Sequence, residues 1–215
     1  MKLLRRSLSE VIGTFFLVLL IQVTVSMKSV DAALAITCGL IGMIYMGGHV
    51  FKAQYNPAVS LAFWMRKTFT ATEASAAVMA QLLGGFAGAL IGGYLSGSTI
   101  AVTPGVSTST GQFLVSEFLF TFALVQVILN VAITNPGNGF YGIAIGFIVF
   151  AGIVAVGPIS GAAFNPAVAI CLNLVNGTPE HIPLYLISTF AGGAFAAVVF
   201  GWMNPKEKSL NLVDS

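Results

Sequence analysis

The sequence contains the same stretch twice, as Asn56-Pro57-Ala58-Val59 and as Asn165-Pro166-Ala167-Val168. One copy lies in each half of the 215-residue chain, and each continues into a short apolar run. Proline removes a backbone N–H and breaks a helix that precedes it, so an Asn-Pro pair is unfavourable inside an ordinary membrane-spanning helix. Its repetition therefore predicts a specialised site to which both halves contribute.

The composition indicates a protein of the lipid bilayer. The chain is 57% hydrophobic and only 7% charged, with a mean hydropathy of +0.94. A soluble domain needs several times this charge density on its surface. The net charge of +2 is too small and too scattered for a nucleic-acid partner. The two cysteines, Cys38 and Cys171, provide neither a disulfide framework nor a metal site. We expect both to be small buried residues, and we expect no cofactor.

Six apolar stretches approach the length of about 20 residues that an α-helix needs to cross a bilayer. They cover residues 8–27, 32–50, 74–95, 112–133, 140–156 and 182–202. Two further apolar stretches, 56–65 and 165–175, are too short to cross, because a ten-residue helix rises only about 15 Å. We predict an all-α membrane protein of six transmembrane helices and two re-entrant half-helices.

The basic residues support this count of spans. With half-helices after the second and the fifth span, every Lys and Arg except Lys28 falls on one side of the membrane. By the positive-inside rule that side is cytoplasmic, and both termini lie there. We expect the cell membrane to be the host, with an internal membrane as the alternative. The cytoplasmic residues are Lys2, Arg5, Arg6, Lys52, Arg66, Lys67, Lys206 and Lys208.

The two halves match beyond the tripeptides. Each begins its first span with a Ser-Glu pair that contains Glu10 or Glu117. Since each half holds an odd number of spans, the second half is inserted upside down relative to the first, as an inverted repeat. We therefore predict a single membrane domain over 1–215, with one repeat at 1–103 and the other at 104–215. The polar stretch 96–111 is the extracellular connection between them.

The repeated motif predicts how the half-helices begin. Asn is a preferred N-cap and Pro is preferred at the first helical position. Inverted symmetry then brings the two N-termini, each with about half a positive charge, together near the midplane. Capping uses the Asn oxygens and leaves both amide protons free to face a lumen. The predicted midplane residues are Asn56, Pro57, Ala58, Asn165, Pro166 and Ala167.

Irregular backbone is expected before each half-helix, over 47–55 and 157–164, where its carbonyls would line a water-filled cavity. Cations would meet an unfavourable field, and a water held by both Asn groups would have its hydrogens turned away, which interrupts proton hopping. Glu10 and Glu117 are costly at membrane depth. We expect them to accept hydrogen bonds from backbone N–H groups of these loops. A carboxylate that snorkels to the end of its span is the alternative for Glu10.

These features resemble the aquaporin (major intrinsic protein) family over nearly the whole chain. The resemblance rests on the paired Asn-Pro-Ala, on Glu-x-x-x-Thr in both repeats and on the stretch Gly161–Val168. It implies one pore per subunit and a homotetramer. It also implies an outer constriction, where many members have an Arg directly after the second Asn-Pro-Ala. This chain has Val there, as tonoplast-type members do. By this resemblance the constriction residues are Ile36, Ile153, Ala162 and Val168.

Compared with a polar one, an apolar constriction offers a water molecule fewer hydrogen-bonding groups to replace those it loses on leaving bulk solvent. We therefore expect a passive channel for water that also admits small neutral solutes such as ammonia, hydrogen peroxide, urea or glycerol. The alternatives are a small-solute or ion channel, or a transporter, with little water permeability. An enzyme is not expected, because the sequence has no nucleophile–base pair. Lys52 at the cytoplasmic mouth is either a solvated charge or a gate, and His49 is interpreted as a packing residue.

Overall fold

The structure is a computed structural model that describes residues 1–205, so the predicted cytoplasmic residues Lys206 and Lys208 lie outside the described part. Within it, six helices are long and apolar enough to cross a membrane, as predicted. The spans are α1 (Lys2–Ser26), α2 (Ala32–Phe51), α4 (Ala71–Ser96), α5 (Thr110–Leu129), α6 (Tyr141–Ser160) and α8 (Ile182–Met203). The short helices α3 (Pro57–Met65) and α7 (Pro166–Asn176) follow α2 and α6. A π-helical turn, η1 (Asn130–Thr134), extends α5, and a 3₁₀ turn, η2 (Pro179–His181), precedes α8.

Several boundaries differ from the prediction. Helix α1 begins at Lys2 rather than at residue 8, because hydropathy detects only the part of a helix that lipid covers. The irregular segments are also shorter than predicted, since α2 continues to Phe51 and α6 to Ser160. Gly47 remains helical, and a side chain there would lie 2.0 Å from the Tyr55 hydroxyl oxygen. This glycine therefore marks a close contact and not the end of a helix.

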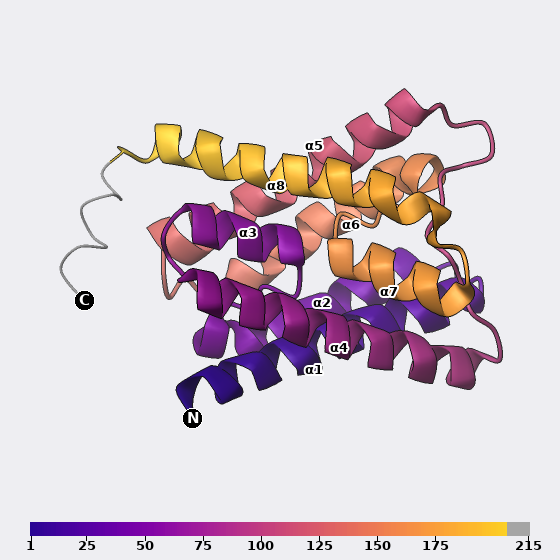
Figure 1. Ribbon diagram of the computed structural model, residues 1–215, viewed down its shortest axis with the longest axis horizontal. Coiled ribbons are helices and arrows are strands. Elements are labelled where there is room, and N and C mark those ends of the chain that lie inside the picture. The colour runs from indigo at the N-terminus through magenta and orange to yellow at the C-terminus, as the bar shows by residue number, and fades with distance from the viewer. Residues whose placement is uncertain (206–215) are drawn as a thin grey trace.

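The two halves pack in the same way. Helix α1 packs on α4 and α2, and α5 correspondingly packs on α8 and α6, while α2 contacts α6 between the halves. Glycines let the backbones approach closely, as is typical of helices in lipid. A Cβ on Gly84 would lie 2.2 Å from the Val11 carbonyl oxygen, and a Cβ on Gly192 would lie 2.5 Å from that of Phe118. The bundle is thus built from two matching sets of helices (Figure 1).

The half-helices complete the bundle from opposite ends. In Figure 1, α3 and α7 lie roughly end to end across the middle of the molecule, each beside α4 and α8. Neither contains enough residues to cross a bilayer. Together they occupy the depth of one span, and their N-termini meet inside the bundle. This arrangement positions the site described below.

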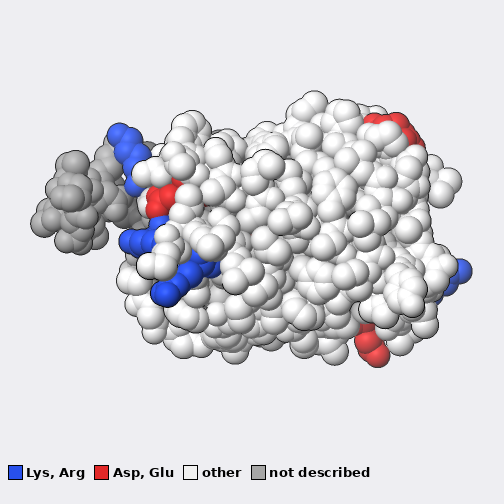
Figure 2. All heavy atoms as spheres, turned by 60° about the horizontal axis from the view of Figure 1, so that its bottom comes forward, with Lys and Arg blue, Asp and Glu red and all other residues white. Residues whose placement is uncertain are grey.

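Charge is concentrated at the ends of the molecule. Figure 2 shows most of the coloured Lys and Arg at the end where Figure 1 places the N-terminus, a smaller charged group at the other end and a long uncharged surface between them. Large apolar side chains such as Leu83 and Phe147 are exposed on the molecule's surface, as expected for contact with lipid. Two predictions about packing were wrong. Cys38 is exposed, whereas Cys171 is buried, and His49 is exposed near the end of α2. All three positions are helical, and hydropathy alone does not tell which face a helix buries.

Candidate pore

Each tripeptide begins a half-helix. Asn56 is the N-cap of α3, and its side-chain oxygen accepts a hydrogen bond from the Ala58 N–H at 2.9 Å. Asn165 is the N-cap of α7 and accepts from the Ala167 N–H at 2.9 Å. The prolines Pro57 and Pro166 occupy the first helical positions, where no N–H is needed. Both half-helices therefore start with the same capped geometry.

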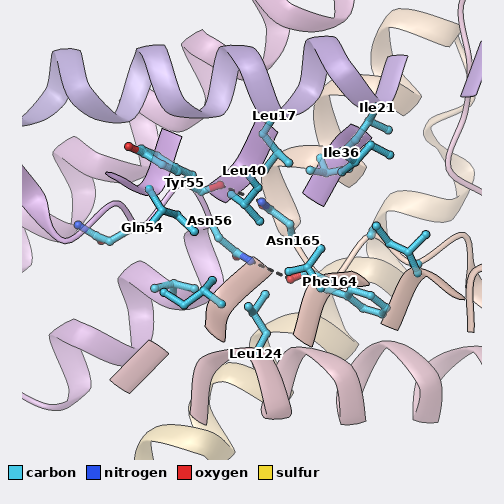
Figure 3. A pocket seen from close by; sticks show the side chains of 18 of the residues that line it. Leu17, Ile21, Ile36, Leu40, Gln54, Tyr55, Asn56, Leu124, Phe164 and Asn165 are labelled. Carbon is cyan, nitrogen blue, oxygen red and sulfur yellow. Dashed lines mark hydrogen bonds between the residues drawn. The ribbon is translucent and has the colours of Figure 1, made fainter. Parts of the chain in front are cut away.

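The two asparagines also tie the halves together. The Asn56 side-chain nitrogen donates to the Phe164 carbonyl at 2.8 Å, and that of Asn165 donates to the Tyr55 carbonyl at 2.8 Å (Figure 3). The expectation that both amide protons face a lumen was therefore wrong. A buried carbonyl needs a donor, and the facing asparagine supplies it. Since a carboxamide carries two N–H bonds, each Asn keeps one for another partner.

Two buried carboxylates hold the loops in front of the half-helices. Glu10 accepts from the backbone N–H of Gln54 at 3.0 Å and of Tyr55 at 2.7 Å. Glu117 accepts from Ala163 at 3.0 Å and Phe164 at 2.7 Å in the other half. Both glutamates are 0% exposed, which rules out the snorkelling alternative for Glu10. The hydrogen bonds expected from the sequence are thus present in both halves.

A third partner of Glu10 was not predicted. The Gln81 side-chain nitrogen donates to Glu10 at 2.7 Å and to the Ser60 hydroxyl at 3.0 Å. Gln81 is fully buried in α4, where the residues from 76 to 95 are otherwise apolar. A lone amide in such a span is a signal that sequence reasoning can use, because a buried polar group needs a hydrogen-bonding partner.

The loops themselves have an unusual backbone. Ala53 and Tyr55 have φ of 48°, and at the equivalent positions Ala162 and Phe164 have φ of 52° and 48°. Residues other than glycine rarely adopt this left-handed backbone conformation, which costs on the order of 1–3 kcal/mol for each residue. The bonds to the glutamates and the asparagine ties fix this conformation. As a result, the loops present their backbone to the space beside the half-helix tips.

That space is a cavity of about 110 Å³. A buried water needs only about 10–15 Å³ of such volume, so several waters fit. Asn56 and Asn165 line the cavity, together with the segments that precede them. The four residues that the family resemblance assigned to the constriction all line it as well: Ile36, Ile153, Ala162 and Val168.

The rest of the cavity wall is strongly apolar. Aliphatic side chains from α1, α2, α5 and α6 surround the asparagine pair, and Figure 3 shows Leu17, Leu40 and Leu124 directed toward it. Gln54 adds an amide whose side-chain oxygen is buried with no partner among residues 1–205. The aliphatic side chains that line the cavity on these four helices are Leu17, Ile21, Val25, Ile36, Leu40, Ile44, Leu124, Ile128, Ile145, Val149 and Ile153.

One lining residue comes from a segment that sequence reasoning treated only as a connection. Val102, between α4 and α5, is 5% exposed and lines the cavity. Its neighbours in sequence are polar or small, and nothing in the pattern distinguishes it from an exposed loop valine. Only the folded chain brings Val102 to the cavity.

Six spans, two half-helices capped tip to tip and a cavity beside the tips define a membrane channel. Residues 1–200 match the family described as "Major intrinsic protein". The probable aquaporin NIP4-2 of Arabidopsis thaliana is 31% identical over 221 residues, which cover 97% of this chain and 77% of that protein. Nodulin-26 of Glycine max is 32% identical over 219 residues, with 97% and 81% coverage.

A solved structure shares the fold. The X-ray structure of the aquaglyceroporin from Plasmodium falciparum superposes with a TM-score of 0.78, at 21% sequence identity, and covers 95% of this chain and 96% of that one. The chain therefore belongs to the major intrinsic protein family. It is an integral, multi-pass membrane channel for water and small solutes, and not an enzyme.

Proposed function

We propose that this channel conducts water and small neutral solutes passively, and that it excludes ions and protons. The observation that carries the proposal is the pair of capped half-helix tips, held together by Asn56 and Asn165 beside the cavity. Two helix N-termini concentrate positive potential at one depth, which repels cations. The remaining N–H of each Asn donates to a passing water and turns its hydrogens outward, so that proton hopping is interrupted.

The solute range depends on the outer constriction, for which we propose Ile36, Ile153, Ala162 and Val168. None of these side chains donates or accepts a hydrogen bond, and Val168 occupies the position where many relatives are expected to have Arg. Such a ring lacks a fixed charge and discriminates weakly by hydrogen bonding. Ammonia, hydrogen peroxide, urea and glycerol are therefore the proposed solutes besides water.

A second candidate follows from the aliphatic wall. A water molecule loses hydrogen bonds to other waters along this wall and finds few polar groups to replace them. A small-solute channel with low water permeability is therefore the alternative. In that case ammonia permeability would exceed that of empty vesicles while osmotic water permeability would not. The two functions are therefore distinguished by the same assay.

The experiment is stopped-flow swelling and solute uptake in vesicles that contain the purified protein, with empty vesicles as control. Water, urea, glycerol and ammonia are tested separately, together with bilayer current for ions. We expect permeation that does not saturate, and no current. Uptake that saturates and depends on an ion gradient would instead identify a transporter, and a measurable current would identify an ion channel.

We also propose a homotetramer in the cell membrane, with both termini in the cytoplasm. The basic residues at the end that carries the N-terminus support this orientation. The exposed apolar side chains are available for contact with lipid or with other subunits. The mass of the detergent-solubilised protein, measured by native mass spectrometry, tests the number of subunits.

A further inference from the structure

The connection between α4 and α5 supplies a wall of the cavity. Val102 lies against the start of the second loop, where a Cβ on Gly161 would be 2.7 Å from a methyl group of Val102. It lines the same cavity as Ala162 and Val168. On the same connection, Val106 is fully exposed. The Val102 side chain is therefore packed inside the structure, whereas Val106 on the same connection is exposed to solvent.

Two buried amides hold this connection in place. The Asn173 side-chain oxygen accepts from the Val102 N–H at 2.8 Å. The Gln22 side chain donates to the Ser98 carbonyl at 2.8 Å and accepts from the Ile100 N–H at 3.3 Å. Asn173 in α7 and Gln22 in α1 are both 0% exposed. Alternate residues of the connection are thus held from two different helices.

The contact of Asn173 carries an energetic penalty. Its side-chain nitrogen is buried and has no hydrogen-bond partner among residues 1–205. A buried donor that is left unpaired destabilises the folded protein. An apolar residue at this position would avoid that penalty, but it would release the Val102 N–H. The carboxamide of Asn173 therefore serves the placement of Val102.

We propose that Val102 is a fifth selectivity residue of the outer constriction, and that Asn173 and Gln22 are positioning residues that fix it there. This inference rests on the proposed function, in which solutes pass through this cavity. A fifth apolar wall leaves one more side of a passing solute without a hydrogen-bonding partner. Solutes with many polar groups, such as urea and glycerol, are disfavoured relative to ammonia, which has few.

The test replaces Val102 by Thr, which keeps the branched shape and adds one hydroxyl. One added hydrogen bond is worth about 1 kcal/mol, so the ratio of urea to ammonia permeability should rise roughly fivefold in V102T vesicles. V106T, on the exposed part of the same connection, is the matched control and should keep the wild-type ratio. Equal ratios in V102T, V106T and wild type would overturn the proposal.

The positioning role is tested with a double-mutant cycle. If Asn173 acts by placing Val102, V102T changes the urea-to-ammonia ratio in the wild-type background and much less in N173A. An undiminished effect in N173A would contradict the positioning role. If N173A inserts poorly into vesicles, Q22A releases the other end of the connection and replaces it in the cycle. A merely structural defect lowers all permeabilities together and leaves the ratio unchanged.

These results separate the two proposals. If wild-type vesicles are no more permeable than empty ones, the proposed function itself is refuted. If wild-type vesicles are permeable but V102T leaves their selectivity unchanged, only the proposed role of Val102 is refuted.

Discussion

At the scale of single residues, the site depends on a few buried polar groups that hold the loops in front of the half-helices. Glu10 is 0% exposed and receives three hydrogen bonds, from Gln54, Tyr55 and Gln81. Without the carboxylate the backbone N–H groups of Gln54 and Tyr55 would be left unpaired, whereas Gln81 would keep the Ser60 hydroxyl as a partner. The position of this one side chain and its two accepting oxygens therefore set the conformation of the first loop.

The first prediction concerns this carboxylate. Glu10→Gln replaces one accepting oxygen by an NH₂ group that faces N–H donors. A buried donor that is left unpaired costs about 1–3 kcal/mol, so we expect thermal unfolding at a lower temperature and reduced conduction. The exposed Glu180 serves as control, since E180Q should change neither. An E10Q protein with wild-type stability and permeability would show that the loop does not need this anchor.

The second prediction concerns Val168, which is 2% exposed and lines the cavity. Val168→Arg adds a fixed positive charge and several donors to an apolar ring. We expect lower permeability to urea and ammonia, with water permeability retained, because water accepts hydrogen bonds from the guanidinium. V168L adds bulk without charge and separates the two effects. Unchanged urea and ammonia permeability in V168R would refute the assignment of this residue to the constriction.

At the scale of helices, the spans could be predicted because lipid requires long and continuous apolar stretches. Their ends were less predictable, since Lys2 and its neighbours continue α1 beyond the part that hydropathy detects. The half-helices were predictable from Asn-Pro, whose capping preferences are local. The ties from Asn56 and Asn165 to the opposite loops were not, because they join residues that only the fold brings together. The same holds for Val102.

The third prediction tests how α1 and α4 approach each other. A Cβ on Gly84 would lie 2.2 Å from a backbone oxygen of α1, which side-chain motion cannot relieve. Gly84→Ala should therefore separate the helices and destabilise the protein by about 1–3 kcal/mol, seen as a lower unfolding temperature in detergent. Gly42 is the matched helical glycine, with nothing within 4 Å of a Cβ. G42A should be neutral or stabilising, since alanine favours helix by about 0.5–1 kcal/mol. Similar losses in both variants would contradict the packing argument.

At the scale of the whole molecule, the inverted repeat places equivalent chemistry at opposite depths. Glu10 with the first loop and Glu117 with the second make the same pair of backbone hydrogen bonds. The charges do not share this symmetry, because Figure 2 shows most of the coloured basic residues at one end and few at the other. The repeat thus builds the cavity, whereas the uneven charges set the direction in which the molecule is inserted.

The last prediction concerns the direction in which the protein is inserted into the membrane. Lys28 follows α1 and Lys67 follows α3, so these two lysines, both exposed, lie at opposite ends of the bundle. In a background without the native cysteines, C38S/C171S, we expect K28C to react with a membrane-impermeant maleimide in intact cells. K67C should react only after the membrane is permeabilised, because the basic end is retained in the cytoplasm. Comparable labelling of both in permeabilised cells controls for accessibility. If K67C and not K28C reacts in intact cells, the topology is the opposite of the one predicted. If both variants react in intact cells, the protein is inserted in both directions.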